Sequence, residues 1–392
     1  MKPLGLTLST LTLLAAIAAP SCSKTGTETD NPMGPDGIEI KRSALGYLTH
    51  VDVPAADSDA LRNGTRAFAL NLYAAVANQS GADENLCLGV NSISTVLTMT
   101  SAGARTTTES EFASVLQHGL AQEALHPAMN QLLLDLQAGF SNTAVRYQAL
   151  NSLWLAKNRQ VAAPFLDVLA QQYDTGVFLV DFLGDAAAAT RSINAWASDQ
   201  TQGLIPELFA AGAIDATSEL VLTNAAYLSA PWRDRFDPTL TKAAEFRLPD
   251  GNVVEVPLMS RQFKYPFAID VDWRALELPF NGTQAAMVFV LPNEGEFSDF
   301  QAKFDANQVQ RIVGAIETAR QDEQLVVAQV PRFEFSASVN LRSSLESLGL
   351  ATAFDAAAAD FTGIDPKGGL YVDGVVHRTT IGVDENGTTA AT

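Results

Sequence analysis

The 392-residue chain contains few of the side chains that build metal sites or covalent staples. It has two cysteines, Cys22 and Cys87, and four histidines. The histidines are His50, His118, His126 and His377. Their scatter along the sequence does not match the spacing of a metal centre, and a chain of this length buries about three quarters of its unfolded surface without disulfides. We expect neither a metal site nor a cofactor.

Positive charge is scarce as well. The chain has 25 Lys and Arg residues against 44 Asp and Glu residues, which gives a net charge of −19 and a pI near 4.5. That charge repels the phosphate backbone of nucleic acid, and no basic cluster offsets it locally. We therefore expect no nucleic-acid partner. With 47% hydrophobic and 18% charged residues, the composition excludes a disordered or fibrous chain.

Motifs of enzyme active sites are missing. The sequence has no P-loop, no dinucleotide-binding glycine pattern, and none of the motifs H-E-x-x-H, C-x-x-C and G-x-S-x-G. An S-x-x-K match at Ser21 and Lys24 spans an expected cleavage site and is set aside. We therefore predict no catalytic residue. An unrelated hydrolase is a further interpretation, but the sequence has no nucleophile motif to support it.

The first 22 residues have the features of an export signal. One early positive charge precedes an apolar run, Leu11–Ala19, that is too short to span a bilayer. The residues Ala19–Cys22 resemble a bacterial lipoprotein cleavage box, although Ala19 and Pro20 stand where that pattern prefers Leu and a small residue. Cleavage there would leave Cys22 to carry lipid, and the protein would be an outward-facing cell-surface lipoprotein. The alternative is a plain signal peptide and a freely secreted protein.

Residues 23–56 are expected to form a flexible tether. Residues 23–37 are rich in Ser, Thr, Gly, Pro and acidic side chains and have no apolar period. About 30 flexible residues span roughly 30 Å, which would hold a folded domain just off a membrane surface. Residues 57–392 read as one continuous unit without a second linker or an internal repeat.

Periodicity within that unit predicts helices first and strands afterwards. Helical spacing occurs over residues 62–78, 93–100, 165–173 and 187–197, and Thr106 with Glu109 forms a capping box. Strand patterns occur over residues 149–155, 220–228, 275–280, 285–291, 325–335 and 370–383, with a short helix over 341–348. Asn281-Gly282 predicts a hairpin. This order predicts an α+β fold with a helix-rich amino-terminal half and large, mostly antiparallel sheets.

Four side chains with potential chemistry fall within this pattern. Cys87 lies in an apolar stretch and is expected in the core. His118 and His126 lie near a helix end and beside a proline, where a solvated surface role is expected. His377 lies inside the last apolar strand, which favours a buried, hydrogen-bonded histidine.

The carboxyl-terminal residues after Val383 carry no bulky side chain, and by themselves they predict a frayed terminus. The segment resembles the hinge of the reactive-centre loop of a serpin, whose pattern is roughly E-E-G-T-E-A-A-A-A-T. The hinge residues here are Glu385, Asn386, Gly387, Thr388, Thr389, Ala390, Ala391 and Thr392. The chain ends before the scissile bond and the terminal strands of a complete member. We therefore expect the domain to be truncated within its reactive-centre loop, so its target cannot be read.

Further segments extend the resemblance over about 330 residues. Residues 223–232 with Phe236 resemble the family signature N-A-x-Y-F-x-G-x-W…F, and residues 193–196 with 201–203 match the helix before it. Residues 276–280, 287–292 and 330–333 follow in the family's order. By the order and spacing of these pieces, the chain is identified as a member of the serpin family, and the resemblance implies the serpin fold.

The resemblance also implies roles for individual residues. Ser92, Asn224 and His377 fall at the shutter, which keeps the central sheet closed, and would form a polar network beneath it. The usual Ser-Pro before this serine is Gly89-Val90 here, which removes one hydroxyl from the network. Trp232 falls at the breach, where insertion begins, although its sequence setting is equally compatible with core packing.

The function implied by the resemblance is suicide inhibition of a serine endopeptidase, with a cysteine endopeptidase as the alternative target, by a monomeric protein. The cleaved loop inserts into the central sheet, and Thr388, Ala390 and Thr392 would face its packed interior. Only small uncharged side chains fit there, and this hinge has them. Non-inhibitory members often have charged or bulky hinge residues. A non-inhibitory binding or carrier protein of the same fold is the alternative.

Overall fold

The computed structural model describes residues 38–391 except 82–83 and 141–143. The helices are α1 (Ala55–Ala77), α2 (Val90–Ser101), α3 (Thr106–Leu116), α4 (Gln122–Phe140), α5 (Ala163–Tyr173), α6 (Phe182–Gln200), α7 (Phe297–Ala302), α8 (Ala306–Ala319) and α9 (Arg342–Ser347). The strands are β1 (Glu39–Lys41), β2 (Arg146–Ala156), β3 (Val177–Val180), β4 (Leu220–Pro231), β5 (Lys242–Arg247), β6 (Val253–Tyr265), β7 (Phe267–Ile269), β8 (Trp273–Pro279), β9 (Ala286–Pro292), β10 (Gln324–Pro331), β11 (Phe333–Asn340), β12 (Val372–Val383) and β13 (Gly387–Ala391).

The largest sheet has the strand order β1-β3-β2-β4-β13-β12-β11. The pairs β2–β3 and β4–β12 are parallel, and the other neighbouring pairs are antiparallel. Helices dominate the chain up to residue 200 and strands dominate the rest. The predicted α+β class with large, mostly antiparallel sheets is therefore confirmed.

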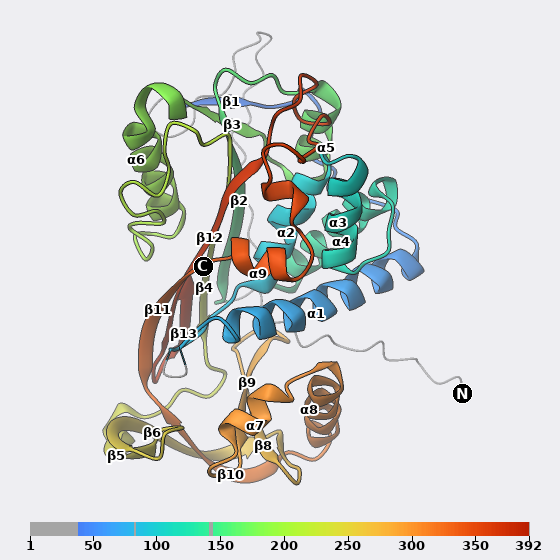
Figure 1. Ribbon diagram of the computed structural model, residues 1–392. Helices are drawn as coiled ribbons and strands as arrows, with labels where there is room; N and C mark the ends of the chain where they lie inside the picture. Colours follow the sequence, from blue (N-terminus) through green and yellow to red (C-terminus); the bar gives the residue numbers. More distant parts are fainter. Residues whose placement is uncertain (1–37, 82–83, 141–143, 392) are drawn as a thin grey trace, which may run out of the picture.

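Helices cover both faces of this sheet. Figure 1 shows α6 on one side and α1 to α4 on the other. On the second side, α2 is buried at every residue from 92 to 101, because its apolar and small hydroxyl side chains pack all round. On the first side, Trp196 of α6 packs edge-on against Trp154, which stacks on Phe178 with ring centroids 4.5 Å apart.

Two smaller sheets, β10-β6-β5 and β7-β8-β9, lie with α7 and α8 at one end of the molecule (Figure 1). The predicted hairpin is confirmed, because β8 and β9 pair antiparallel. Its connection runs from Phe280 to Ala285 and so is wider than an Asn-Gly turn. Gly282 has φ +73°, the left-handed conformation that glycine supplies without strain.

The prediction of one strand over residues 325–335 is wrong. The chain turns at Arg332 and forms β10 and β11, which belong to different sheets. The backbone N–H of Arg332 donates to the carbonyl of Pro257, one position beyond the Pro331–Leu258 pair, so the ladder with β6 ends here, and from Phe333 onward the chain pairs with β12. Apolar residues alternate on both sides of the turn, so periodicity alone does not mark it.

The predicted tether extends too far into the domain. Strand β1 pairs with β3, the Tyr47 hydroxyl donates to Asn130 over 2.8 Å, and the Leu48 N–H donates to the carbonyl of Gln171. Helix α1 then begins at Ala55. Segments from β1 onward are therefore packed, because their backbone groups find partners on the sheet and on helices. Cys22 and the remainder of the predicted leader and tether lie outside the described residues.

None of the helices in the described ranges is long and apolar enough to cross a membrane. In the same ranges, no cluster of three or more His, Cys, Asp or Glu side chains could hold a metal ion.

Candidate functional site: the seam between β4 and β12

Strands β4 and β12 form a fork in the centre of the large sheet. They pair in parallel where Leu220–Thr223 meets Val372–Val376, and then they separate. Strand β13 lies between the separated parts and is antiparallel to both, with Gly387 opposite Pro231 and Ala391 opposite Tyr227. We call this line the seam, its directly paired part the closed end, and the part that holds β13 the filled end.

Three positions on each strand separate the two ends of the seam. They are Asn224–Ala226 on β4 and His377–Thr379 on β12. A strand that continued β13 would run along these positions and then reach the closed end. Beyond these three positions, β13 could be extended only if the pairs at the closed end parted.

Small side chains let β13 occupy the seam. Thr388 is 2% exposed, and its Oγ1 lies 4.0 Å from the sulfur of Met287, while Thr389 is exposed. Ala390 packs against the core, which agrees with the inward alternation expected from the sequence. At Gly387, an added Cβ would lie 2.2 Å from the carbonyl oxygen of Ala230, so only glycine fits this approach. Thr392 lies outside the described residues.

The turn between β12 and β13 is stabilised by its own residues. The Asp384 carboxylate accepts from the N–H groups of Asn386 and Gly387 at 2.7 and 3.0 Å, and the Asp384 N–H donates to the carbonyl of Gly387. This is an Asx-type turn. The run Asp-Glu-Asn-Gly is typical of such turns, so the role of Asp384 was readable from the sequence although it was not predicted.

Trp232 connects this turn to the end of β4. Its indole N–H donates to the carbonyl of Asp384 over 2.9 Å, and its backbone N–H donates to the carbonyl of Asn386. The ring is 2% exposed and stacks on Phe280, with centroids 5.1 Å apart. Trp232 therefore serves core packing and also contacts the hinge; its breach role stays a prediction.

Glu385 is held by partners from separate segments of the chain. It is 6% exposed, accepts from the Thr241 hydroxyl at 2.7 Å, and lies 3.6 Å from the guanidinium of Arg332. Its backbone carbonyl accepts from Phe236. Glu385, Thr241 and Arg332 are far apart in the sequence, so no local pattern indicated this pairing.

The three predicted shutter residues are all buried near the fork, at 4%, 3% and 1% exposure for Ser92, Asn224 and His377. Asn224 donates to the side chain of Asn151 over 2.5 Å, and His377 Nε2 accepts from the Gly89 N–H over 3.0 Å. Among the described residues, neither Ser92 Oγ nor His377 Nδ1 has a hydrogen-bond partner. Ser92 is therefore brought to the site but not hydrogen-bonded into it, and the shutter role stays a prediction.

Burial fixes the neutral form of His377. Because Nε2 accepts a hydrogen bond, the proton is on Nδ1, and burial lowers the pKa of His377 to about 4. The expected buried role of this histidine therefore agrees with the structure. The adjacent Thr379 hydroxyl donates to the carbonyl of Cys87, which is half-buried against the core, and burial raises the pKa of the Cys87 thiol.

The expectation of solvated surface positions for His118 and His126 is wrong. They are 5% and 4% exposed, and His126 Nδ1 lies 2.7 Å from the hydroxyl of Tyr173. Burial lowers the pKa of each histidine to about 4. Packing of α4 against α5 buries His126, whereas His118, between α3 and α4, lies against Gly64 of α1. Neither contact can be read from neighbours in the sequence.

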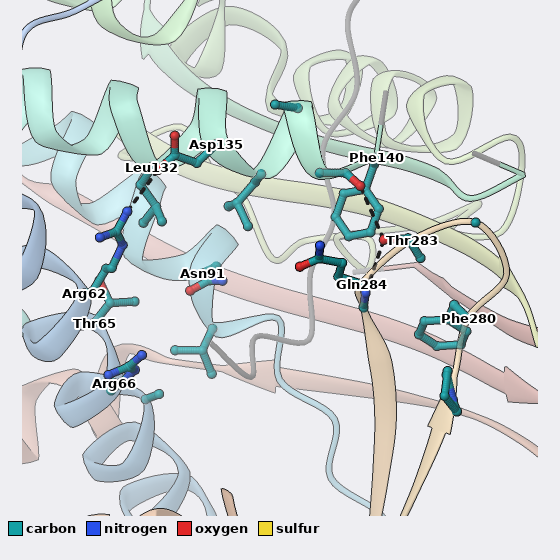
Figure 2. Close-up of a pocket in the computed structure, with 18 of the residues that line it drawn as sticks. Arg62, Thr65, Arg66, Asn91, Leu132, Asp135, Phe140, Phe280, Thr283 and Gln284 are labelled. Carbon is teal, nitrogen blue, oxygen red and sulfur yellow. Dashed lines mark hydrogen bonds and ion pairs between the residues drawn. The ribbon is translucent and has the colours of Figure 1, made fainter. Parts of the chain in front are cut away.

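A cleft of about 990 Å³ lies outside the seam. Figure 2 shows it between α1, α4 and the β8–β9 turn, with Arg62, Arg66 and Asn91 facing Phe280 and Gln284. Asp135 pairs with Arg62 over 2.9 Å on its wall. Apolar side chains supply much of the remaining lining.

Three comparisons place the chain among known proteins. Residues 63–392 match the family model Serpin (serine protease inhibitor). An uncharacterised serpin-like protein of Thermococcus kodakarensis is 32% identical over 370 residues, covering 92% of this chain and 83% of the relative. The leukocyte elastase inhibitor of Xenopus tropicalis is 31% identical over 334 residues, covering 83% and 86%.

Among solved structures, the reactive-loop-cleaved human thyroxine-binding globulin superposes with a TM-score of 0.76 at 26% identity. The match covers 85% of this chain and 96% of the other. With the family model spanning most of the chain, the protein belongs to the serpin family.

Proposed function

We propose that this protein is an inhibitor of serine endopeptidases, with cysteine endopeptidases as a second target class, that acts by inserting its cleaved loop along the seam. The observation that carries the proposal is β13 itself. This strand of small residues already lies in the centre of the large sheet and pairs with β4 on one side and with β12 on the other. The target supplies the catalytic chemistry, so no residue of the inhibitor has to act as an acid, base or nucleophile.

Extension of β13 provides the driving force. Each further residue that enters the seam satisfies backbone groups on both neighbouring strands, and each hydrogen bond contributes about 1 kcal/mol net. A protease held as an acyl-enzyme at the end of the loop would be carried along before deacylation. The inhibitor would then be stable for kinetic reasons rather than at equilibrium.

The test uses the complete gene product, including any residues that follow Thr392. Mixed with a susceptible serine protease, it should form a complex that survives boiling in detergent. The Thr388→Arg variant should instead be cleaved as a substrate, because a guanidinium at this buried position opposes the first step of insertion. The matched control is Thr389→Arg, at the exposed neighbouring position, which should still form the complex. Cleavage of the unmodified inhibitor with full recovery of protease activity would contradict the proposal.

One observation favours the alternative of a small-molecule carrier, namely the cleft between α1, α4 and the β8–β9 turn. The solved relative named as thyroxine-binding globulin shares the fold. A carrier would be cleaved in its loop without trapping the protease. The complex assay therefore separates the two functions.

We further propose that Cys22 carries lipid and anchors the protein on the outer cell surface. Stable anchoring needs two membrane-binding signals, so a fully acylated protein should resist a salt wash of the membrane fraction. The variant Cys22→Ser should move to the soluble fraction. Wild-type protein found free in the medium would show instead that it is secreted.

A further inference from the structure

The closed end of the seam carries polar contacts that the proposed function does not use. They join residues just before β4 to residues just before and within β12. Both segments must move apart if an incoming strand is to pass the fork. These contacts therefore lie across the last part of the seam that an inserting strand would have to follow.

Arg159 makes the first group of contacts. It lies in the turn after β2, and its side chain is 17% exposed. Its Nε donates to Glu219, one residue before β4, over 2.7 Å. Its two terminal nitrogens donate to the carbonyls of Gly368 and Gly369 over 3.0 and 2.8 Å, and one lies 3.5 Å from the buried carboxylate of Asp365. One guanidinium thus binds both segments.

The loop before β12 is shaped for this contact. Gly368 and Gly369 have φ values of +73° and +71°, so two successive residues adopt the left-handed conformation. Side chains larger than hydrogen are strained there. The conformation directs both carbonyl groups at Arg159.

A second pair crosses the seam directly. The Ser218 hydroxyl donates to the carboxylate of Asp373 over 2.5 Å, and Ser218 is 2% exposed. Asp373 stands at the register shift between Val372 and Gly374, where the parallel ladder has an extra residue. The Tyr371 hydroxyl adds a bond to the carbonyl of Thr217 over 3.0 Å.

We propose that Arg159 and the Ser218–Asp373 pair form a latch that holds the closed end and sets the rate at which an inserting strand completes its path. Insertion of one strand moves its neighbours apart by about 4.8 Å, which exceeds the reach of every contact described above. Each contact must therefore break before the closed end opens. The role of the latch in insertion rests on the proposed function, whereas its existence does not.

Hydrogen exchange on the 392-residue chain tests the latch directly. In Arg159→Lys and in Ser218→Ala, amides of residues 220–223 and 372–376 should exchange about tenfold faster or more, because a charged or buried hydrogen bond is lost. The matched control is Arg320→Lys, which weakens a comparable Arg–Glu277 pair that does not touch the seam. This control variant should leave the exchange rates of the amides at the closed end unchanged. Unaltered exchange in both latch variants would overturn the proposal.

Two further readouts separate a latch from a merely structural contact. The double variant Ser218→Asp with Asp373→Ser swaps the hydroxyl and the carboxylate between the two segments. Because the pair can form again, hydrogen exchange of the amides at the closed end should return to the slow rate of wild type. In the complete gene product, Arg159→Lys should form the protease complex faster, whereas a purely structural role would only lower the yield of folded protein. Faster exchange with an unchanged rate of complex formation would overturn the gating role. If wild type forms no complex, the proposed inhibitory function fails, and exchange alone decides whether the latch exists.

Discussion

Single residues in this protein were predictable where their role depends on size and unpredictable where it depends on distant partners. Thr388 and Ala390 face the core as their place in the hinge pattern suggested. Arg159 gave no signal, because its partners Glu219 and Gly368 lie 60 and 209 positions away. The burial of His126 likewise follows from tertiary packing. Sequence patterns report side-chain size and period, whereas contacts across a sheet depend on its topology.

Buried histidines make stability depend on pH. Burial lowers the pKa values of His118, His126 and His377 from 6.5 to about 4, so between these values the unfolded chain binds more protons than the folded one. Stability should therefore be fully retained above pH 6.5 and fall as the pH drops towards 4, by about 1.4 kcal/mol per pH unit for each histidine.

Urea unfolding between pH 7 and 4 measures this dependence. In the His377→Gln variant, the neutral side chain can still accept the hydrogen bond from the Gly89 N–H. The free energy of unfolding should then change less steeply with pH, by the contribution of one histidine. A slope identical to that of wild type would show that His377 does not contribute.

At the scale of elements, apolar runs in the sequence predicted where the strands lie, but they did not predict which strands pair with each other. The patterns over residues 220–228 and 370–383 predicted β4 and β12, yet nothing local indicated that these strands pair at one end only. The same limit explains why β10 and β11 were merged into one strand. Alternation identifies a strand, whereas the sheet to which it belongs depends on where the chain turns.

The fit of β13 can be tested at its first residue. Gly387→Ala would place a methyl group against the backbone of Ala230 and Pro231, so β13 should pair more weakly, by about 1–3 kcal/mol. The control is Gly314→Ala, in α8, where nothing lies within 4 Å and the change should stabilise the protein by about 0.5–1 kcal/mol. Thermal unfolding and hydrogen exchange of β13 measure both effects. Equal behaviour of the two variants would contradict the described strand register.

At the scale of the whole molecule, the proposed function requires the large sheet to be both the packed centre of the fold and the part that opens. Helices cover both faces, so the sheet can widen only within its own plane (Figure 1). The filled end shows that an additional strand fits between β4 and β12, and we propose that the contacts at the closed end resist its extension. In the proposed mechanism, the balance between these two features would determine whether the loop enters the sheet.

Thermal unfolding of the complete gene product, before and after cleavage in the loop by a protease that it does not trap, tests the central claim most directly. Completing β13 as a central strand adds backbone hydrogen bonds on both sides, each worth about 1 kcal/mol net. We predict that the cleaved protein unfolds at a higher temperature, by on the order of 10 °C or more. An unchanged or lower unfolding temperature after cleavage would contradict insertion of the loop along the seam.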